Sequence, residues 1–316
     1  MFILALKISF MATGGSKFAI FASMAANLGI AVMKFIAAFF TGSSAMFSEG
    51  IHSLVDTSNG MLLLWGIKRS KMSPDQKHPF GYGMEIYFWS FVVSIFVFAL
   101  GGGVALYEGI KHLLEHSSEI DHSTKMKYWN YGVLIGSLLF EGASLWVGWK
   151  EFRKSYPKGF IRSMAKSKDA PTVAVIIENG AAVLGLLIAF IGITLTYYYN
   201  NPVFDAWASI FIGLLLTLVS LFMAVETKHL LIGESAVEKD IQAIEHIFKQ
   251  YKELEGYGNI KTMHLGPDDI LLGANINFKD DLTVKQIEPI VQDIKNKIIA
   301  DNPKIKYVFI ETDSIK

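Results

Sequence analysis

The sequence contains no cysteine. This absence excludes disulfides and thiolate chemistry, so a bound metal ion must rely on histidine, carboxylate or neutral oxygen ligands. Charge is also scarce, because only 18% of the 316 residues are charged, whereas soluble domains carry about a quarter. The 29 basic and 29 acidic residues cancel to a net charge of zero. That balance gives no reason to expect a nucleic acid as a partner.

Hydrophobic residues make up 52% of the chain, and their long runs indicate a lipid bilayer as the surrounding medium. A membrane-crossing helix needs about 20 mostly apolar residues. Segments of this kind cover roughly residues 17–41, 43–67, 85–113, 129–152, 171–198 and 203–225. The sequence therefore predicts an all-α bundle of six transmembrane helices within a domain of residues 1–228, with residues 1–16 as a short leader.

Basic residues near the helix ends predict the orientation, because positive charge favours the cytoplasmic side. The two connections richest in lysine and arginine follow the second and fourth helices, and their basic residues are Lys68, Arg69, Lys71, Lys77, Lys150, Arg153, Lys154, Lys158, Arg162, Lys166 and Lys168. Both connections are placed in the cytoplasm, and six crossings put both termini there too. The expected location is the cell (inner) membrane, crossed several times.

Residues 229–316 have the composition of a soluble domain. Their patterns predict helices at about 237–251 and 284–300, and strands at about 260–264, 270–278 and 307–311. This αββαβ order is typical of a ferredoxin-like α+β domain. Because this part has no glycine-rich phosphate loop and no nucleophile motif, we expect it to dock or dimerise and not to catalyse.

The second helix carries polar groups at membrane depth, namely Glu49, His52, Asp56 and Asn59. At about 100° per residue they fall within an arc of roughly 80° and form one polar stripe. Ionisable groups in the bilayer are costly unless they are paired, hydrated or bound to metal, so a functional site is the default interpretation. His52 and Asp56, spaced i and i+4, supply one nitrogen and one oxygen ligand, half of a tetrahedral zinc shell.

The fifth helix supplies a facing group, because Glu178 and Asn179 interrupt an otherwise apolar run just before several small residues. Small residues let helices approach closely. The predicted metal ligands are therefore His52, Asp56 and Glu178, and the accessory candidates are Glu49, Asn59 and Asn179. The alternative interpretation is that these side chains only join helices through hydrogen bonds, and we favour it for Asn179 taken alone.

Lys34 and Asp205, two other polar residues of the spans, are assigned structural roles. Lys34 is expected to extend its ammonium group to the membrane interface, and Asp205 lies at the start of the sixth helix. In the loop SPDQKHPFGYG, residues 73–83, Asp75 and His78 are spaced as a possible second metal site, while the proline and glycines shape a tight turn.

These motifs resemble the cation diffusion facilitators, a family of zinc and manganese exporters. The segment SEGIHSLVDTSN is similar to the family's signature with its ligand pair at His52 and Asp56, and HPFGYG and ETKHLLIGE are similar to two further family segments. The resemblance is strongest to the branch with glutamate in the fifth helix, here Glu178. It implies a zinc preference, because histidine at the first pair position is typical of zinc-preferring members, and it implies a homodimer.

The sequence departs from the family pattern in two places. The family usually has a ligand four residues before the carboxylate of the fifth helix, but Ala174 stands there, so water, Asn59, Asn179 or Glu49 would have to supply the fourth ligand. The metal site that bridges the cytoplasmic domains in relatives is reduced, and the residues that remain for it are His264, Asn275, Glu311 and Asp313.

The prediction is a divalent-cation transporter, for zinc first, that exports metal from the cytoplasm by alternating access. Its ligands bind metal only when deprotonated, so loading Zn²⁺ expels protons, and H⁺ is the expected counter-ion. No cofactor is required, and the expected partners are the metal ion, the bilayer and a second copy. The alternatives are a preference for manganese, iron or cobalt, and a channel, which the confined stripe disfavours. A membrane metalloenzyme with Glu49 as its base and a protein that acts only through its C-terminal domain rank lower, and we expect no enzyme.

Overall fold

A computed structural model of the chain describes residues 17–115, 124–155 and 170–312. The expected leader and part of the basic segment after the fourth helix lie outside the described residues. The chain divides into two compact units, Met1–Trp65 with Trp89–Thr227, and Gly66–Phe88 with Lys228–Lys316. The second unit therefore combines the C-terminal region with the loop that follows the second helix.

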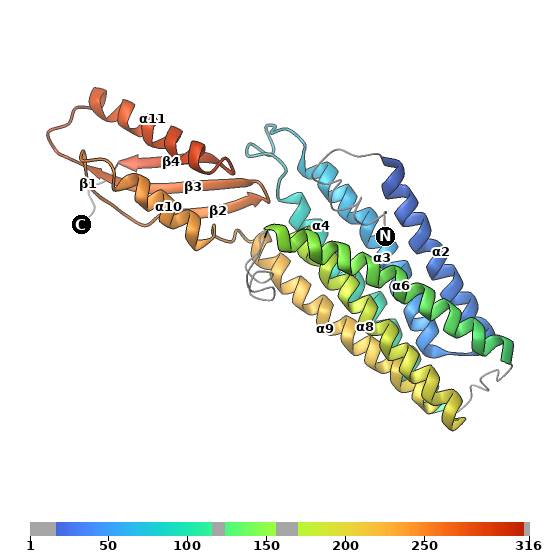
Figure 1. The fold of residues 1–316 in the computed structure, drawn as a ribbon. Helices are drawn as coiled ribbons and strands as arrows, with labels where there is room; N and C mark the ends of the chain where they lie inside the picture. The colour runs from blue at the N-terminus through green and yellow to red at the C-terminus, as the bar shows by residue number, and fades with distance from the viewer. Residues whose placement is uncertain (1–16, 116–123, 156–169, 313–316) are drawn as a thin grey trace. The chain divides into compact units, whose positions relative to one another are not determined.

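The first unit consists of long helices (Figure 1). They are α2 (Lys17–Thr41), α3 (Ser44–Ser70), the consecutive α4 (Glu85–Phe96), η1 (Val97–Gly103) and α5 (Val104–Glu115), α6 (Thr124–Ser155), α8 (Ala170–Tyr199) and α9 (Val203–Leu231). Within the described residues, four stretches are long and apolar enough to cross a membrane: Glu85–Glu115, Lys127–Lys150, Ile176–Tyr199 and Val203–Leu231. The α3 helix, which carries the polar stripe, is not among them. The predicted helical membrane domain is confirmed at this level.

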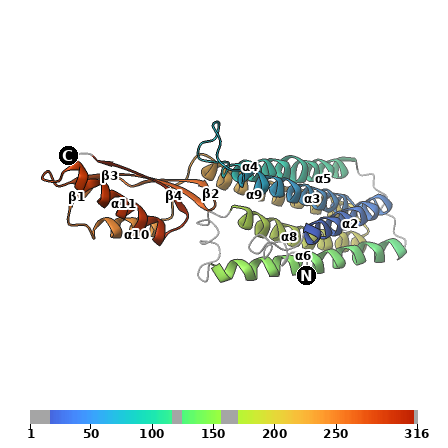
Figure 2. The same cartoon turned by 90° about the horizontal axis from the view of Figure 1, so that it is seen from above.

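Glycines let the third helical segment lie directly against α9. A Cβ atom on Gly109 would lie 2.8 Å from the backbone nitrogen of Ile210, and one on Gly213 would lie 2.7 Å from that of Leu106. Neither space admits a side chain, so the backbones of α5 and α9 are in contact, as small residues permit in membrane bundles. The helices run lengthwise beside one another (Figure 2).

The third segment differs from the single continuous helix that the sequence predicts. Residues Val97–Gly103 form a π-helix between α4 and α5. Three consecutive glycines, 101–103, end this stretch. Glycine stabilises α-helical backbone poorly, so the local geometry is free to widen where the neighbouring helix favours it.

The second unit contains α10 (Glu238–Phe248), β1 (Leu254–Tyr257), β2 (Lys261–Gly266), β3 (Asp269–Phe278), α11 (Val284–Asp301) and β4 (Ile305–Thr312). Strands β1 and β2 pair with β3 antiparallel, whereas β4 pairs with it parallel. Because β2 and β4 bond to the same stretch of β3, Ile270–Gly273, they occupy its two opposite edges.

The short strand β1 was not predicted, so the order is αβββαβ and not αββαβ. Its four residues, LEGY, show no alternation of apolar and polar side chains, and its pairing with β3 shifts register between Leu254 and Gly256. Such a strand exists because β3 extends beyond β2 and offers it unpaired backbone groups, which a local pattern cannot reveal.

One face of the sheet is covered by both helices. Along β3 every second residue is buried, in the order Ile270, Leu272, Ala274, Ile276 and Phe278. These side chains join one hydrophobic cluster with Ile244 and Phe248 of α10 and with Ile294 and Ile298 of α11. The alternation of period two places one face of β3 in the core, as expected for a half-covered sheet. The domain is therefore α+β, as predicted.

The loop between α3 and α4 packs on this sheet. The ring of Phe80 meets Tyr307 and Phe309 of β4 edge to face, with ring centroids 5.1 and 6.4 Å apart. The Tyr307 hydroxyl donates a hydrogen bond to the Phe80 carbonyl at 3.3 Å. Gly83 lies so close to the Leu265 carbonyl that no Cβ atom would fit. The loop is therefore part of the second unit.

Candidate metal site

In the predicted ligand pair of α3, His52 is buried inside the helical unit and Asp56 is partly buried. His52 is 2% exposed, and its Nδ1 lies 3.6 Å from Asp56 Oδ1, one turn further along the helix. Neither ring nitrogen of His52 has a hydrogen-bond partner among the described residues. Buried imidazoles are normally hydrogen-bonded, and a ring without such a bond is unusual. In the neutral form of His52, one ring nitrogen therefore has a lone pair available to a metal ion.

The carboxylate of α8 reaches the same stripe of α3. Asn59 Nδ2 donates a hydrogen bond to Glu178 Oε1 at 3.1 Å, and both side chains are buried. This contact joins α3 to α8 at Asn59, whereas a contact of Glu178 with His52 and Asp56 stays a prediction. The α3 helix carries His52, Asp56 and Asn59 at i, i+4 and i+7, which returns to nearly the same face after two turns.

The structure brings these groups together in pairs. His52 contacts Asp56, and Asn59 contacts Glu178. Over the described residues, no group of three or more His, Asp and Glu side chains is close enough to hold a metal ion together. The site residues therefore stay predictions.

Two amide groups at this place, one from Asn59 and one from Asn179 next to Glu178, have an atom without a hydrogen bond among the described residues. Within the described part of the chain, Asn59 Oδ1 and Asn179 Nδ2 are buried and have no hydrogen-bond partner. An amide oxygen can serve as a neutral ligand, whereas an NH₂ group cannot. Exchanging the oxygen and nitrogen of Asn179 by rotation of the amide would present its oxygen instead. Both amides therefore remain candidates for a further ligand.

Lys34 does not extend to the membrane interface, and this corrects the expectation from the sequence. Its side chain is fully buried, and its Nζ lies 2.9 Å from Glu49 Oε2 and 2.8 Å from Ser53 Oγ. An ammonium group at membrane depth is stabilised better by a carboxylate inside the bundle than by a long reach to the interface. No sequence pattern indicates this contact, because Lys34 and Glu49 lie on different helices.

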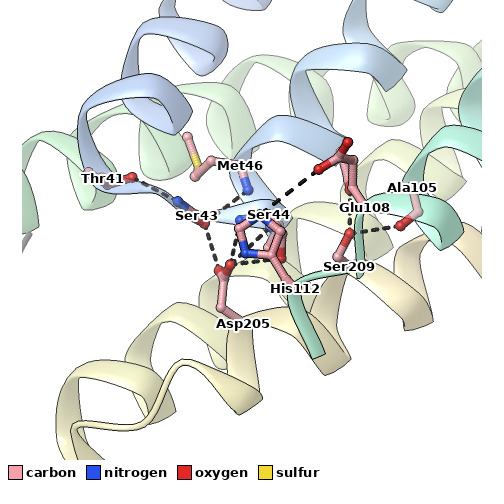
Figure 3. Close-up of polar contacts among 11 residues, drawn as sticks. Thr41, Ser43, Ser44, Met46, Ala105, Glu108, His112, Asp205 and Ser209 are labelled. Carbon is pink, nitrogen blue, oxygen red and sulfur yellow. Dashed lines mark hydrogen bonds and ion pairs between the residues drawn. The ribbon is translucent and has the colours of Figure 1, made fainter. Parts of the chain in front are cut away.

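At the N-terminal end of α3, the carboxylate of Asp205 caps the helix (Figure 3). Its Oδ2 accepts hydrogen bonds from the backbone nitrogens of Ser44 and Ala45, at 2.5 and 3.2 Å, and from the Ser44 hydroxyl at 2.9 Å. Its Oδ1 accepts a bond from the Ser43 hydroxyl at 2.6 Å. A carboxylate at this position satisfies amide donors that a helix leaves unpaired and complements its dipole. Asp205 therefore joins α9 to the start of α3.

The loop site proposed for Asp75 and His78 has a structural use for its carboxylate. Asp75 Oδ1 accepts hydrogen bonds from the backbone nitrogens of Lys77 and His78, and Oδ2 accepts one from the Tyr82 hydroxyl at 2.7 Å. The bond from Tyr82 is the main cause that holds the pKa of Asp75 below its usual range. His78 Nδ1 lies 3.5 Å from Asp75 Oδ1. The two side chains are together, and a metal site on them stays a prediction.

The reduced site of the sheet domain shows one of its expected contacts. Asn275 Nδ2 donates to Glu311 Oε2 at 3.2 Å, between β3 and β4, on an exposed part of the sheet. His264 is buried at the end of β2, and Asp313 lies outside the described residues. A metal site on these residues therefore stays a prediction.

Comparison with known proteins gives matches over both units. Residues 20–232 match the family model described as the cation efflux transmembrane domain, and residues 236–315 match the one described as the cation efflux protein, cytoplasmic domain. A similar protein of Mus musculus is the "Proton-coupled zinc antiporter SLC30A9, mitochondrial", 35% identical over 250 residues, which are 78% of this chain and 43% of that protein.

Two further relatives extend the range of organisms. Metal tolerance protein C4 of Arabidopsis thaliana is 29% identical over 85% of this chain and 59% of its own length. The manganese efflux system protein MneP of Bacillus subtilis is 25% identical over 92% of this chain and 93% of its own length. The chain thus spans less than half the length of the mouse relative and nearly all of the bacterial one.

Proposed function

Because this chain belongs to the cation efflux family, the cation diffusion facilitators that its motifs resemble, we propose that it exports Zn²⁺ in exchange for protons. Membership makes the chain a multi-pass membrane protein that transports metal cations and is not an enzyme. The metal, the counter-ion, the direction and the ligands are the parts that belong to the proposal.

The observation that carries the proposal is the pair of buried His52 and partly buried Asp56, on the same helix as the Asn59 that contacts Glu178. These side chains come from two helices that meet inside a membrane domain, and the imidazole nitrogens have no hydrogen-bond partner among the described residues. We assign His52, Asp56 and Glu178 as the ligands of the transported ion. An amide oxygen of Asn59 or Asn179, or a water molecule, completes the shell.

Zinc is the proposed substrate because the ligand set mixes one imidazole with carboxylates. Zn²⁺ binds nitrogen and oxygen ligands in four-coordinate sites, whereas Mn²⁺ is better served by oxygen ligands alone. The name of the mouse relative specifies zinc, and that of the Bacillus relative specifies manganese. Manganese, iron and cobalt are the alternative substrates, and histidine at position 52 is the feature that favours zinc.

Proton coupling follows from the chemistry of the ligands. Each ligand must lose its proton to bind Zn²⁺, so metal loading releases protons and protonation releases metal. Exchange of one Zn²⁺ for two H⁺ would move no net charge across the membrane, whereas exchange for one H⁺ would be opposed by about 2.3 kcal/mol per 100 mV of inside-negative potential. The ligand chemistry is compatible with both ratios.

The proposed mechanism is alternating access about the contact of α3 with α8. A buried site can open to one side at a time only if the helices that carry its ligands have two packings. Both helices carry proposed ligands, so a change in their packing would move His52 and Asp56 relative to Glu178.

The topology of the proposal has six crossings in the cell (inner) membrane with both termini in the cytoplasm. Two basic residues in the last turn of α3, Lys68 and Arg69, support a cytoplasmic position for the C-terminal end of this helix. The sheet domain is proposed to be ferredoxin-like, with α10 and α11 on one face, and to pair two copies of the chain into a homodimer. The match of residues 236–315 to the cytoplasmic domain of the family supports this assignment.

Zn²⁺ uptake into sealed proteoliposomes under an imposed pH gradient tests the proposal. We expect flux that follows the gradient in the native protein and is lost in Asp56→Ala and Glu178→Ala, because each variant removes a ligand. His52→Asp, which makes the shell all oxygen, should transport Mn²⁺ better relative to Zn²⁺. Flux that ignores the gradient would reject proton coupling, and flux that survives the loss of Asp56 would reject the site.

A further inference from the structure

We propose that Lys34 is a tethered cation that withholds Glu49 from the transported metal and so keeps the metal site weak enough to release its cargo. The inference rests on the proposed function, because it concerns the same polar stripe of α3. It assigns Lys34 a role in setting metal affinity, and it places Glu49 outside the ligand shell although its position on the stripe would allow it to join.

The contact is buried on every side. Lys34 and Glu49 are both fully buried, with Lys34 Nζ 2.9 Å from Glu49 Oε2. The ammonium group also donates to Ser53 Oγ at 2.8 Å, one turn beyond Glu49 on α3. Met33, the preceding residue on α2, is 42% exposed, whereas Phe35 packs its ring against Phe47 of α3. Lys34 therefore turns its charge inward onto the polar stripe.

The second oxygen of Glu49 is enclosed but makes no hydrogen bond among the described residues. Glu49 Oε1 is buried without a hydrogen-bond partner among the described residues. It lies so close to Gly185 of α8 that a Cβ atom on that residue would clash with it. The carboxylate is thus fixed between the ammonium of α2 and a position in α8 that only glycine leaves open. An unshared carboxylate oxygen in a buried place keeps full capacity to bind a cation.

Glu49 lies within reach of the proposed ligands. Residues spaced i and i+3 on a helix are neighbours, with Cβ atoms about 5–6 Å apart, so Glu49 is adjacent to His52. Without Lys34, a bare carboxylate beside the imidazole would attract a divalent ion strongly, because charge interactions are weakly screened in the bilayer interior. With Lys34 in place the pair is neutral, and metal binding depends on His52, Asp56 and Glu178.

A transporter must also release its metal, so excess affinity slows turnover. Removing only the ammonium group should therefore strengthen Zn²⁺ binding and slow transport together. Removing the ammonium and the carboxylate together deletes a neutral pair and should leave the affinity near the native value. A buried ion pair replaced by neutral groups of similar size often costs little stability, which makes the double variant a suitable test.

The experiment measures Zn²⁺ affinity by calorimetry on the purified full-length protein, and Zn²⁺ flux in proteoliposomes. For Lys34→Met we expect a dissociation constant lower by roughly tenfold or more, with KM and the maximal rate both reduced. For Lys34→Met with Glu49→Gln we expect a dissociation constant within about threefold of the native value. Ser53→Ala is the matched control, because it removes a hydrogen bond of the same ammonium without changing charge, and it should bind Zn²⁺ as the native protein does.

Two results would overturn the inference. If Lys34→Met binds Zn²⁺ no more tightly than the native protein, the ammonium does not restrain Glu49. If the double variant loses tenfold or more in affinity, Glu49 is itself a ligand. The double variant decides alone should Lys34→Met fail to fold. Asp56→Ala separates this question from the proposed function, because undiminished Zn²⁺ binding in that variant would reject the metal site whatever Lys34 does.

Discussion

At the scale of the residue, the contact between Asn59 and Glu178 offers a direct test of how the ligands are oriented. Asn59→Ala removes the amide that donates to Glu178 Oε1 at 3.1 Å. Groups that orient a metal ligand, or complete its shell, typically contribute about 10–100-fold to affinity. We expect Zn²⁺ affinity, measured by calorimetry, to fall by about that factor.

The matched control for this prediction is Asn130→Ala in α6. Asn130 is also a buried asparagine, and its Nδ2 donates to the Tyr197 hydroxyl at 3.3 Å, away from the polar stripe. Its replacement should leave Zn²⁺ affinity unchanged. Equal losses in both variants would mean that Asn59 acts only through the packing of the helices.

The candidate ligands were predicted from the cost of polar groups in a membrane, and their role as ligands stays a prediction. The order Glu49, His52, Asp56 and Asn59 defines a face by helical periodicity alone. The bond from Asn59 to Glu178 agrees with the expected approach of α8. The partner of Lys34 could not be predicted, because helix periodicity says which residues share a face and not which face of another helix meets it.

At the scale of the element, Asp205 stabilises the N-terminal end of α3. Asp205→Ala removes the acceptor for the backbone nitrogens of Ser44 and Ala45 and for two hydroxyls. A lost cap costs about 1 kcal/mol, and buried donors left unpaired cost about 1–3 kcal/mol each. We expect a lower thermal unfolding midpoint of the purified protein, and a smaller decrease for Asp205→Asn, which keeps one acceptor oxygen.

Zinc affinity should be nearly unchanged in both variants, because His52 lies about 12 Å along the helix from Ser44 at 1.5 Å per residue. Asp301→Ala, at the exposed end of α11, is the control for loss of one acidic residue. An unfolding midpoint that stays at the native value in Asp205→Ala would show that the cap does not stabilise the bundle.

The elements themselves were predictable to different degrees, for physical reasons. Long apolar runs predicted the helices of the first unit with end positions that differ by up to six residues, as at Leu231 of α9, because crossing length is set by the bilayer. The π-helix Val97–Gly103 and the strand β1 were missed. The geometry of η1 depends on how closely α9 approaches its glycines, and β1 depends on unpaired groups of β3. Both are decided by neighbours that are distant in sequence, so no local pattern encodes them.

At the scale of the whole molecule, the chain leaves α3 through a loop that belongs to the sheet unit. Phe80 fastens this loop through its edge-to-face contacts with Tyr307 and Phe309 and through the hydrogen bond to its carbonyl from Tyr307. Aromatic pairs of this kind contribute about 0.5–1.5 kcal/mol beyond the area they bury. Phe80→Ala should therefore loosen the loop without unfolding the sheet, whose core lies on the face covered by α10 and α11.

Hydrogen exchange of the full-length protein measures this effect. Amides of the loop 72–84 and of the β4 residues next to Tyr307 should exchange faster in Phe80→Ala, because the free energy of opening that contact is lower. The rest of the sheet should keep its protection. Phe98→Ala is the control: this equally exposed aromatic ring lies on η1 in the helical unit, and its loss should leave loop exchange unchanged. Native protection of the loop in Phe80→Ala would show that Gly83, packed against Leu265, holds the loop instead, and that the aromatic contacts are incidental.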